Sequence, residues 1–196
     1  MTRISPRFPH LVAFGLGALF ALLSAPAHAA RLVQSQVESV AKTNMPGLTV
    51  VAKTSAAQGE LVVNGAEIKS LKASFGATTM KTGMEARDTH MYKHIFAPAG
   101  SVQKEGDELK APDVVIEGNF AACTRTSTKC DLAANVTIAG VTRPYSFPAT
   151  VSSEGDAIKL SAEPVVKLSD FGIKEPSQMG VKVKNEVALK LEGTFR

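Results

Sequence analysis

The feature that most constrains this chain is the strict alternation of its last sixteen residues, 181–196. Apolar and charged side chains alternate there, and that period of two is typical of a β-strand with one buried face and one solvent-exposed face. The apolar positions are Val181, Val183, Val187, Leu189, Leu191 and Phe195, and the polar positions are Lys182, Lys184, Glu186, Lys190, Glu192 and Arg196.

The same alternation recurs along the chain and predicts an antiparallel all-β fold. In the first of these segments we place Val33, Val37 and Ala41 on one face, and Pro164 predicts an edge or a bulge in the last. About eight strands with one apolar side each must form either a two-sheet sandwich or a closed barrel. Periodicity alone does not choose between these two. The predicted strands before the final one are 32–42, 48–53, 61–63, 68–77, 114–120, 132–138, 145–151 and 158–168.

Residues 82–96 are the exception and predict a short helix. Thr82 and Glu85 have the spacing of a capping box at a helix start. Residues three and four apart are helical neighbours, so two faces are expected. One face carries Met84, Asp88, Met91 and Ile95, and another carries Arg87, His90 and His94. The following segment, 97–113, is rich in Gly, Pro and charge and predicts a long excursion over the surface or across an opening.

The N-terminus is built like an export signal. Arg3 and Arg7 precede the uncharged run 11–23, and Ala27-His28-Ala29 has the small-x-small form of a cleavage site. We expect a cleaved signal peptide over 1–29 and a single domain over 30–196. The apolar run is shorter than the roughly 20 residues that a spanning helix needs, so we expect no membrane span.

Charge and cysteine content narrow the function classes further. The whole chain has 22 basic and 18 acidic residues, and Arg3 and Arg7 leave with the predicted signal, so the remainder is close to neutral. A nucleic-acid partner is not expected, because such partners favour a clustered basic face. Cys123 and Cys130 flank a polar loop in a chain predicted to be exported, which predicts a disulfide across a hairpin. A metal pair or a reactive thiol would need closer spacing or further ligands.

Three motifs resemble those of the YceI-like, or polyisoprenoid-binding, family of periplasmic lipocalin-like proteins. They are TGMEARDTHM at 82–91, VTIAGVTRPYSFPATV at 136–151 and LSDFGI at 168–173, in the family's order. The resemblance implies an extended antiparallel eight-stranded lipocalin-like β-barrel with a short helix against it. It also implies a periplasmic location and a long apolar cavity for an isoprenoid quinone or a polyprenyl phosphate. Ser39 and Ala52 stand where the family usually has an aromatic residue and a glycine.

The resulting hypothesis is a periplasmic binding protein that sequesters or transports an isoprenoid or similar amphiphilic lipid, without catalysis or a cofactor. A membrane donor or acceptor protein is the further partner considered. Enclosing one five-carbon unit contributes up to roughly 4 kcal/mol, so such a site needs no sharp polar motif. The candidate ligand-binding residues are Phe75, Met84, Arg87, Asp88, His90, Met91, Phe96, Phe120, Phe147 and Phe171.

Two alternatives stay open at this point. One is an enzyme that uses His90 and His94, with Asp88 or Glu85, around a metal or as acid and base; the other is an envelope stress or interaction module with a packed core. Arg87 and Asp88 could hold a polar head group or pair with each other. Asp170-Phe171-Gly172 predicts a turn, with Ser169 or Asp170 bonding backbone donors and Phe171 plugging the barrel. No serine lies in a G-x-S-x-G elbow, so we assign no catalytic residue. We also assign no metal ligand, because a metal site needs a third well-placed ligand.

Overall fold

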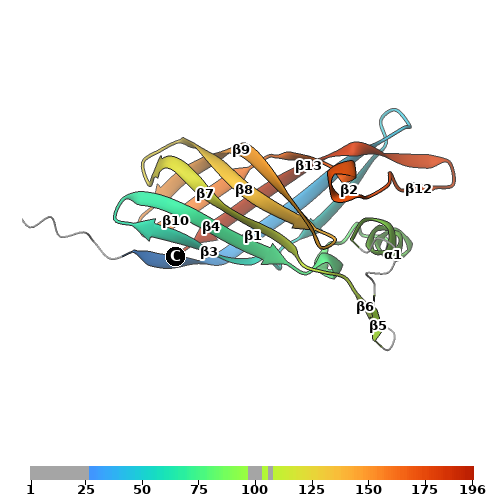
Figure 1. Cartoon of the computed structure of the whole chain (residues 1–196), viewed down its shortest axis with the longest axis horizontal. Helices are drawn as coiled ribbons and strands as arrows, with labels where there is room; N and C mark the ends of the chain where they lie inside the picture. Colours follow the sequence, from blue (N-terminus) through green and yellow to red (C-terminus); the bar gives the residue numbers. More distant parts are fainter. Residues whose placement is uncertain (1–26, 97–102, 106–107) are drawn as a thin grey trace, which may run out of the picture.

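The computed structural model describes residues 27–96, 103–105 and 108–196, and it confirms a barrel rather than a sandwich (Figure 1). Eight antiparallel strands form a continuous sheet, which closes where the last strand pairs with the first. Most of the predicted signal peptide lies outside the described residues. The strands of the barrel are β1 (His28–Thr43), β3 (Gln58–Asn64), β4 (Glu67–Phe75), β7 (Val114–Thr124), β8 (Lys129–Ile138), β9 (Val141–Glu154), β10 (Ala157–Ala162) and β13 (Val181–Phe195).

The barrel is elongated because β1 and β13 are long enough to have two successive neighbours each. β1 pairs first with β3 and farther along with β2 (Thr49–Thr54). β13 pairs with β10 and then with β11 (Val165–Lys167), and Pro164 lies at the break between those two strands, as predicted. A short strand, β12 (Ser177–Gln178), adds a hairpin to β13. β2 and β11 therefore extend one end of the barrel.

The helix α1 (Glu85–Met91) lies across this extended end (Figure 1) and continues into a π-helical turn, η2 (Tyr92–Phe96). We call this the helix end. The predicted capping box is wrong: Met84 is the N-cap residue, and the Thr82 hydroxyl bonds to Asp88 rather than serving Glu85. Within the described residues, no helix has the length and apolar content that crossing a membrane requires. A small hairpin of β5 (Gln103–Glu105) and β6 (Glu108–Lys110) projects nearby; residues 97–102 and 106–107 of the predicted excursion lie outside the described residues.

The opposite end contains the disulfide, and we call it the disulfide end. Cys123 of β7 and Cys130 of β8 are bonded across the hairpin turn, with their Cα atoms 5.4 Å apart, as predicted. Both cysteines are buried. In the turn between them, the Thr124 backbone N–H donates to Ser127 Oγ at 3.0 Å. The covalent bridge and the hairpin turn therefore fix the connection between β7 and β8 at this end.

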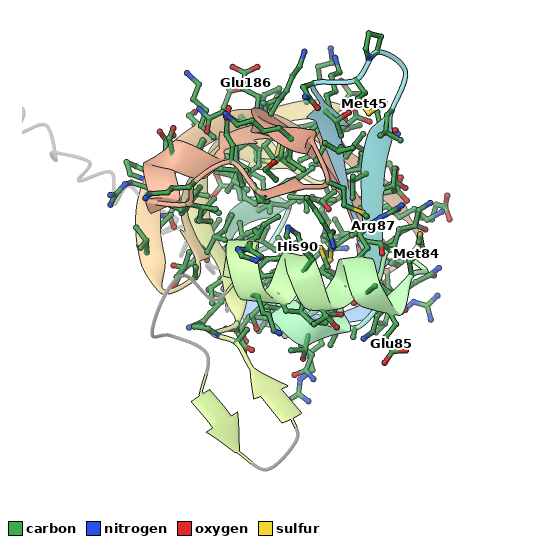
Figure 2. All side chains as sticks on the ribbon, turned by 90° about the vertical axis from the view of Figure 1, so that its right-hand side faces the viewer. Met45, Met84, Glu85, Arg87, His90 and Glu186 are labelled. Carbon is green, nitrogen blue, oxygen red and sulfur yellow. A yellow bond between two sulfur atoms is a disulfide. The ribbon has the colours of Figure 1, made fainter. Side chains whose placement is uncertain are left out.

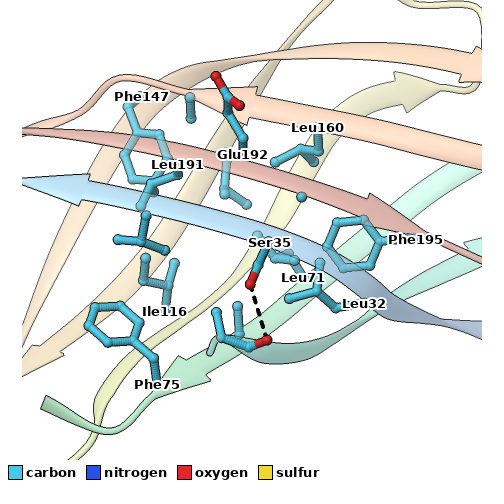
Figure 3. Close-up of a pocket in the computed structure, with 16 residues that line it drawn as sticks. Leu32, Ser35, Leu71, Phe75, Ile116, Phe147, Leu160, Leu191, Glu192 and Phe195 are labelled. Atoms are coloured by element: carbon cyan, nitrogen blue, oxygen red, sulfur yellow. Dashed lines mark hydrogen bonds between the residues drawn. The ribbon is translucent and has the colours of Figure 1, made fainter. Parts of the chain in front are cut away.

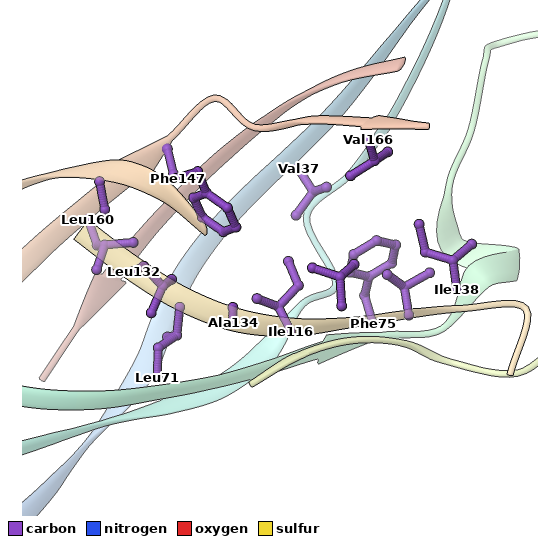
Figure 4. Packing of buried hydrophobic residues seen from close by; sticks show 14 of the residues in the cluster. Val37, Leu71, Phe75, Ile116, Leu132, Ala134, Ile138, Phe147, Leu160 and Val166 are labelled. Carbon is purple, nitrogen blue, oxygen red and sulfur yellow. The ribbon is translucent and has the colours of Figure 1, made fainter. Parts of the chain in front are cut away.

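The apolar faces predicted from the alternation point into the barrel (Figure 4). One position departs from the prediction: Val33 is 56% exposed, although Val37 and Ala41 are buried. The pairing of β1 with β13 slips between Leu32 and Gln34, and such a bulge moves a side chain to the other face. A residue-by-residue pattern does not reveal this extra residue.

The LSDFGI motif folds as a 3-10 turn, η3 (Leu168–Phe171), between β11 and β12. Phe171 is 1% exposed and stacks on Tyr145, with ring centroids 6.0 Å apart. Asp170 does not bond backbone donors as predicted, because its Oδ2 accepts the Tyr145 hydroxyl at 2.7 Å. Ser169 instead meets Asn185, whose Oδ1 accepts the Ser169 backbone N–H at 2.8 Å. Burial and the bond to Asp170 raise the pKa of Tyr145.

Candidate functional site

The larger of two voids is a cavity of about 450 Å³ at the helix end, which we call the mouth cavity. Its walls come from β1, β2, β13, η2 and α1, and nearly all of them are apolar. A barrel with a fully packed core does not match this volume. The lining residues are Ser39, Ala41, Leu48, Val50, Ala52, Met84, Ala86, Arg87, His90, Met91, Ile95, Phe96, Ile138, Val166, Leu168, Pro176, Gln178, Met179, Val181, Val183, Val187 and Leu189.

A second void of about 50 Å³ lies deeper in the barrel, and we call it the inner void (Figure 3). Its wall includes Leu71, Phe75, Ile116, Phe147 and Leu160. The interior is therefore divided: the helix end holds most of the free volume, and the rest of the barrel is nearly filled. This differs from the single long cavity that the family resemblance implied.

Asp88 fixes the start of the helix and lines neither void. Its carboxylate is buried and accepts the Thr82 backbone N–H at 2.7 Å and the Thr82 hydroxyl at 2.6 Å. Arg87 and Asp88 do not form an ion pair with each other. The Tyr92 hydroxyl adds a second anchor, because it lies 2.6 Å from the Met80 carbonyl oxygen. These bonds attach the helix to the segment that follows β4.

His90 is one of two polar groups that the helix contributes to the cavity wall. Its ring lies 4.2 Å from that of His94, and its Nε2 atom is buried without a hydrogen-bond partner among the described residues. Burial, followed by the charge of His94, lowers the pKa of His90 and favours the neutral imidazole. Arg87 lines the same cavity, and Figure 2 shows both side chains on α1. One edge of an apolar space thus carries a guanidinium and an imidazole.

The described residues contain no cluster of three or more His, Cys, Asp or Glu side chains placed to hold a metal ion. His90 and His94 are adjacent, but Asp88 is occupied by Thr82, and Glu85 is exposed at the start of the helix. A metal centre needs a third well-placed ligand. The described part of the site therefore offers hydrogen bonds and apolar contact.

Exposed apolar side chains surround the opening of the mouth cavity. Met179 is 97% exposed and Met84 is 53% exposed, and both also line the cavity. Met45 and Met179 lie on two hairpin tips that Asn44 joins, because its Oδ1 accepts the Lys182 backbone N–H at 2.8 Å and its Nδ2 donates to the Gly180 carbonyl at 3.1 Å. An apolar rim of this kind is unusual for a surface that faces only water.

The ten candidate residues separate into three groups. Five line the mouth cavity, two line the inner void, and three line neither, so most of the candidates taken from the helix motif lie at the mouth cavity. Ligand binding by any of them remains a prediction. The groups are Met84, Arg87, His90, Met91 and Phe96 in the mouth cavity; Phe75 and Phe147 in the inner void; and Asp88, Phe120 and Phe171 in neither.

Sequence reasoning missed the strand residues that form most of the mouth cavity. It had placed Val183, Val187 and Leu189 on the inner face of the last strand, but not at the open end. Ser39 and Ala52, the two departures from the family pattern, both line this cavity and pair directly across β1 and β2. Their small side chains were a usable signal, because small inward residues leave space.

Comparison with known proteins places this chain among a set of similar barrels. The family model described as the YceI-like domain matches residues 30–195. Burkholderia cenocepacia BcnA is 15% identical with a TM-score of 0.65, covering 82% of this chain and 95% of that one. A polyisoprenoid binding domain from Saccharophagus degradans, implicated in plant cell wall breakdown, is 11% identical with a TM-score of 0.62, covering 85% and 97%. A Campylobacter jejuni YceI protein is 17% identical with a TM-score of 0.52, covering 79% and 84%. No curated protein matches.

Proposed function

This chain belongs to the YceI-like family, and from that premise we propose that it is a periplasmic protein that sequesters or transports an isoprenoid lipid in the mouth cavity. The observation that carries this proposal is the apolar cavity of about 450 Å³ in an otherwise filled barrel. Each enclosed methylene-sized group contributes about 0.8 kcal/mol, so a few prenyl units supply the affinity of a carrier. The polyisoprenoid binding domain among the similar structures supports the same ligand class.

The two kinds of wall define how an amphiphile would lie. The tail would contact the apolar inner faces of β2 and β13, where Val50, Val187 and Leu189 line the cavity. The polar end would face α1, where the Arg87 guanidinium would donate forked hydrogen bonds and the unpartnered Nε2 of His90 would supply one more. A quinone carbonyl or a phosphate oxygen accepts such bonds, so isoprenoid quinones and polyprenyl phosphates fit equally.

The proposed location and route rest on two further features. The Cys123–Cys130 disulfide requires an oxidising compartment, which the periplasm provides. The exposed rim, including Met45, Met84 and Met179, would contact either a membrane or a donor or acceptor protein while the lipid enters. Because an isoprenoid is insoluble, such transfer needs a surface that keeps the tail out of water.

Native mass spectrometry of the protein purified gently from periplasm tests the proposal. We expect a discrete additional mass that extracts as an isoprenoid. Ala52→Phe places a ring in the mouth cavity and should remove that mass, whereas Ala133→Phe, on the exposed outer face of β8, should retain it. Protein that carries no lipid and binds neither quinones nor polyprenyl phosphates in titration would contradict the proposal.

A further inference from the structure

The division of the barrel interior limits the length of the ligand's tail. We propose that the mouth cavity accepts a tail of about three five-carbon units and excludes longer ones, because the barrel is closed below it. This inference rests on the proposed lipid-binding function and adds an upper limit on tail length. The full barrel is long enough for a longer chain, so the limit comes from its side chains and not from its strands.

The volume sets the limit. A molecule in a liquid occupies roughly 30 Å³ per water-sized group, so the mouth cavity of about 450 Å³ holds about fifteen methylene-sized groups. That is about three prenyl units. The inner void adds only about 50 Å³, which is less than one further unit. A tail of eight units has about forty carbons and would leave most of its length outside the protein.

One level of the barrel separates the two voids. On β1, Val37 lines the inner void and the next inward residue, Ser39, lines the mouth cavity. On β13 the same change occurs between Leu191 and Leu189. The pairing register joins these positions directly, because Val37 lies opposite Leu191 and Ser39 lies opposite Leu189. The boundary is therefore a single cross-strand layer.

Phe75 supplies the bulk of this layer. Its ring is buried and lines the inner void, as Val37 does. Figure 4 shows Val37, Ile116 and Phe75 between Leu71 and Leu132 on one side and Ile138 on the side of the helix. Removing the Phe75 ring should join the two voids and admit about one further prenyl unit, because Phe→Ala deletes about six carbon atoms.

The experiment measures which tails the protein removes from a membrane. The purified mature protein is incubated with phosphatidylcholine vesicles that contain equal amounts of prenyl alcohols of two, three, four and eight units, and native mass spectrometry reads the bound species. When an alcohol with a longer tail leaves the bilayer, the carbons that do not fit into the mouth cavity are exposed to water. We therefore expect the two- and three-unit alcohols to load, and the four- and eight-unit alcohols to load at least about tenfold less.

Phe75→Ala should raise loading of the four-unit alcohol to that of the three-unit alcohol. The matched control is Phe120→Ala, which removes the same atoms from a buried site that lines neither void, and should leave the wild-type limit unchanged. Thermal melting checks that each variant is folded. Val37→Ala opens the same layer with a smaller deletion, and should shift the limit in the same direction if Phe75→Ala does not fold.

The outcomes separate this inference from the proposed function. Wild-type protein that loads the eight-unit alcohol as well as the three-unit alcohol overturns the length limit and leaves lipid binding intact. A shift produced equally by Phe120→Ala overturns the assignment of the limit to the Val37–Phe75 layer. Loading of no alcohol by the wild type overturns the length limit, because no tail is then accepted, and the titration with quinones and polyprenyl phosphates decides the proposed function separately. Loading confined to short tails, with a shift specific to Phe75→Ala or Val37→Ala, supports the inference.

Discussion

The disulfide end and the helix end of the barrel are closed in different ways. At the disulfide end, neighbouring strands pair through the ladder, and the inner void holds only about 50 Å³. At the helix end, the turn η3 and the helix α1 complete the wall, and a cavity of about 450 Å³ remains. One continuous sheet therefore surrounds a nearly filled core in one half of the barrel and a cavity in the other.

The difference in free volume follows from the way in which each end is closed. A backbone ladder brings strands about 4.8 Å apart, and their inward side chains then fill the narrow interior. A helix that lies across an opening is not held at the spacing of a strand ladder, so it leaves a larger separation. Asp88 and Tyr92 supply those anchors through bonds to Thr82 and Met80. We expect mutations to separate the two halves into one that controls stability and one that controls binding.

The largest expected effect is on stability, from matched leucine truncations in the two halves. Leu61→Ala should lower the free energy of unfolding by about 2–5 kcal/mol, because Leu61 is 0% exposed and lines neither void, so its removal leaves a new cavity. Leu189→Ala should cost less than half as much, because Leu189 already borders free volume. Urea unfolding of both variants measures the difference, and equal losses would contradict the division into two halves.

An intermediate effect is expected at the disulfide. Replacing Cys123 and Cys130 by serine should lower the free energy of unfolding by about 2.5 kcal/mol, because a loop of this size loses that much chain entropy when it is closed. Lipid loading of the folded variant should be unchanged, since the bridge lies at the end away from the mouth cavity. Thermal melting with and without reducing agent gives the first quantity. A large loss of loading in folded, reduced protein would show that the two ends are coupled.

The smallest effect is expected at His90, and it should appear as a pH dependence. Burial lowers the pKa of His90 in the folded state, so the unfolded chain takes up the proton at higher pH, and stability is lost as pH falls below about 6.5. His90→Gln should flatten this dependence between about pH 7.5 and 5, above the range in which the paired carboxylates of Glu38 and Glu175 titrate. Melting temperatures across that window provide the measurement, and parallel profiles for the two proteins would contradict it.

Much of the architecture was predictable because its signals are local. The alternation in 181–196 identified the apolar inward residues of the last strand, though not Gly193, which lines the inner void, since a side-chain period of two depends only on the backbone. The spacing of Cys123 and Cys130 indicated their bond. Two of the local errors have specific causes: Val33 turned outward because of a bulge, and Thr82 bonded to Asp88, three residues beyond the expected partner. Both depend on contacts that a sequence pattern does not contain.

The candidate site was predictable only in part. The helix motif identified Met84, Arg87, His90 and Met91 because their residue types are unusual in a chain of strands. Phe120 and Phe171 were chosen as large apolar side chains, yet both are core residues away from the voids. A buried phenylalanine and a ligand-lining phenylalanine look the same in a sequence, because both face inward on a strand.

The sequence by itself determined the strands, their inward faces, the position of the helix and the disulfide, because each depends on residues that are close along the chain. Only the tertiary structure decided where the barrel is empty. Free volume depends on how side chains from β1, β4 and β13 meet across the interior, and the register that sets Val37 opposite Leu191 comes from pairing between segments about 150 residues apart. The proposed limit on tail length therefore depends on the tertiary structure.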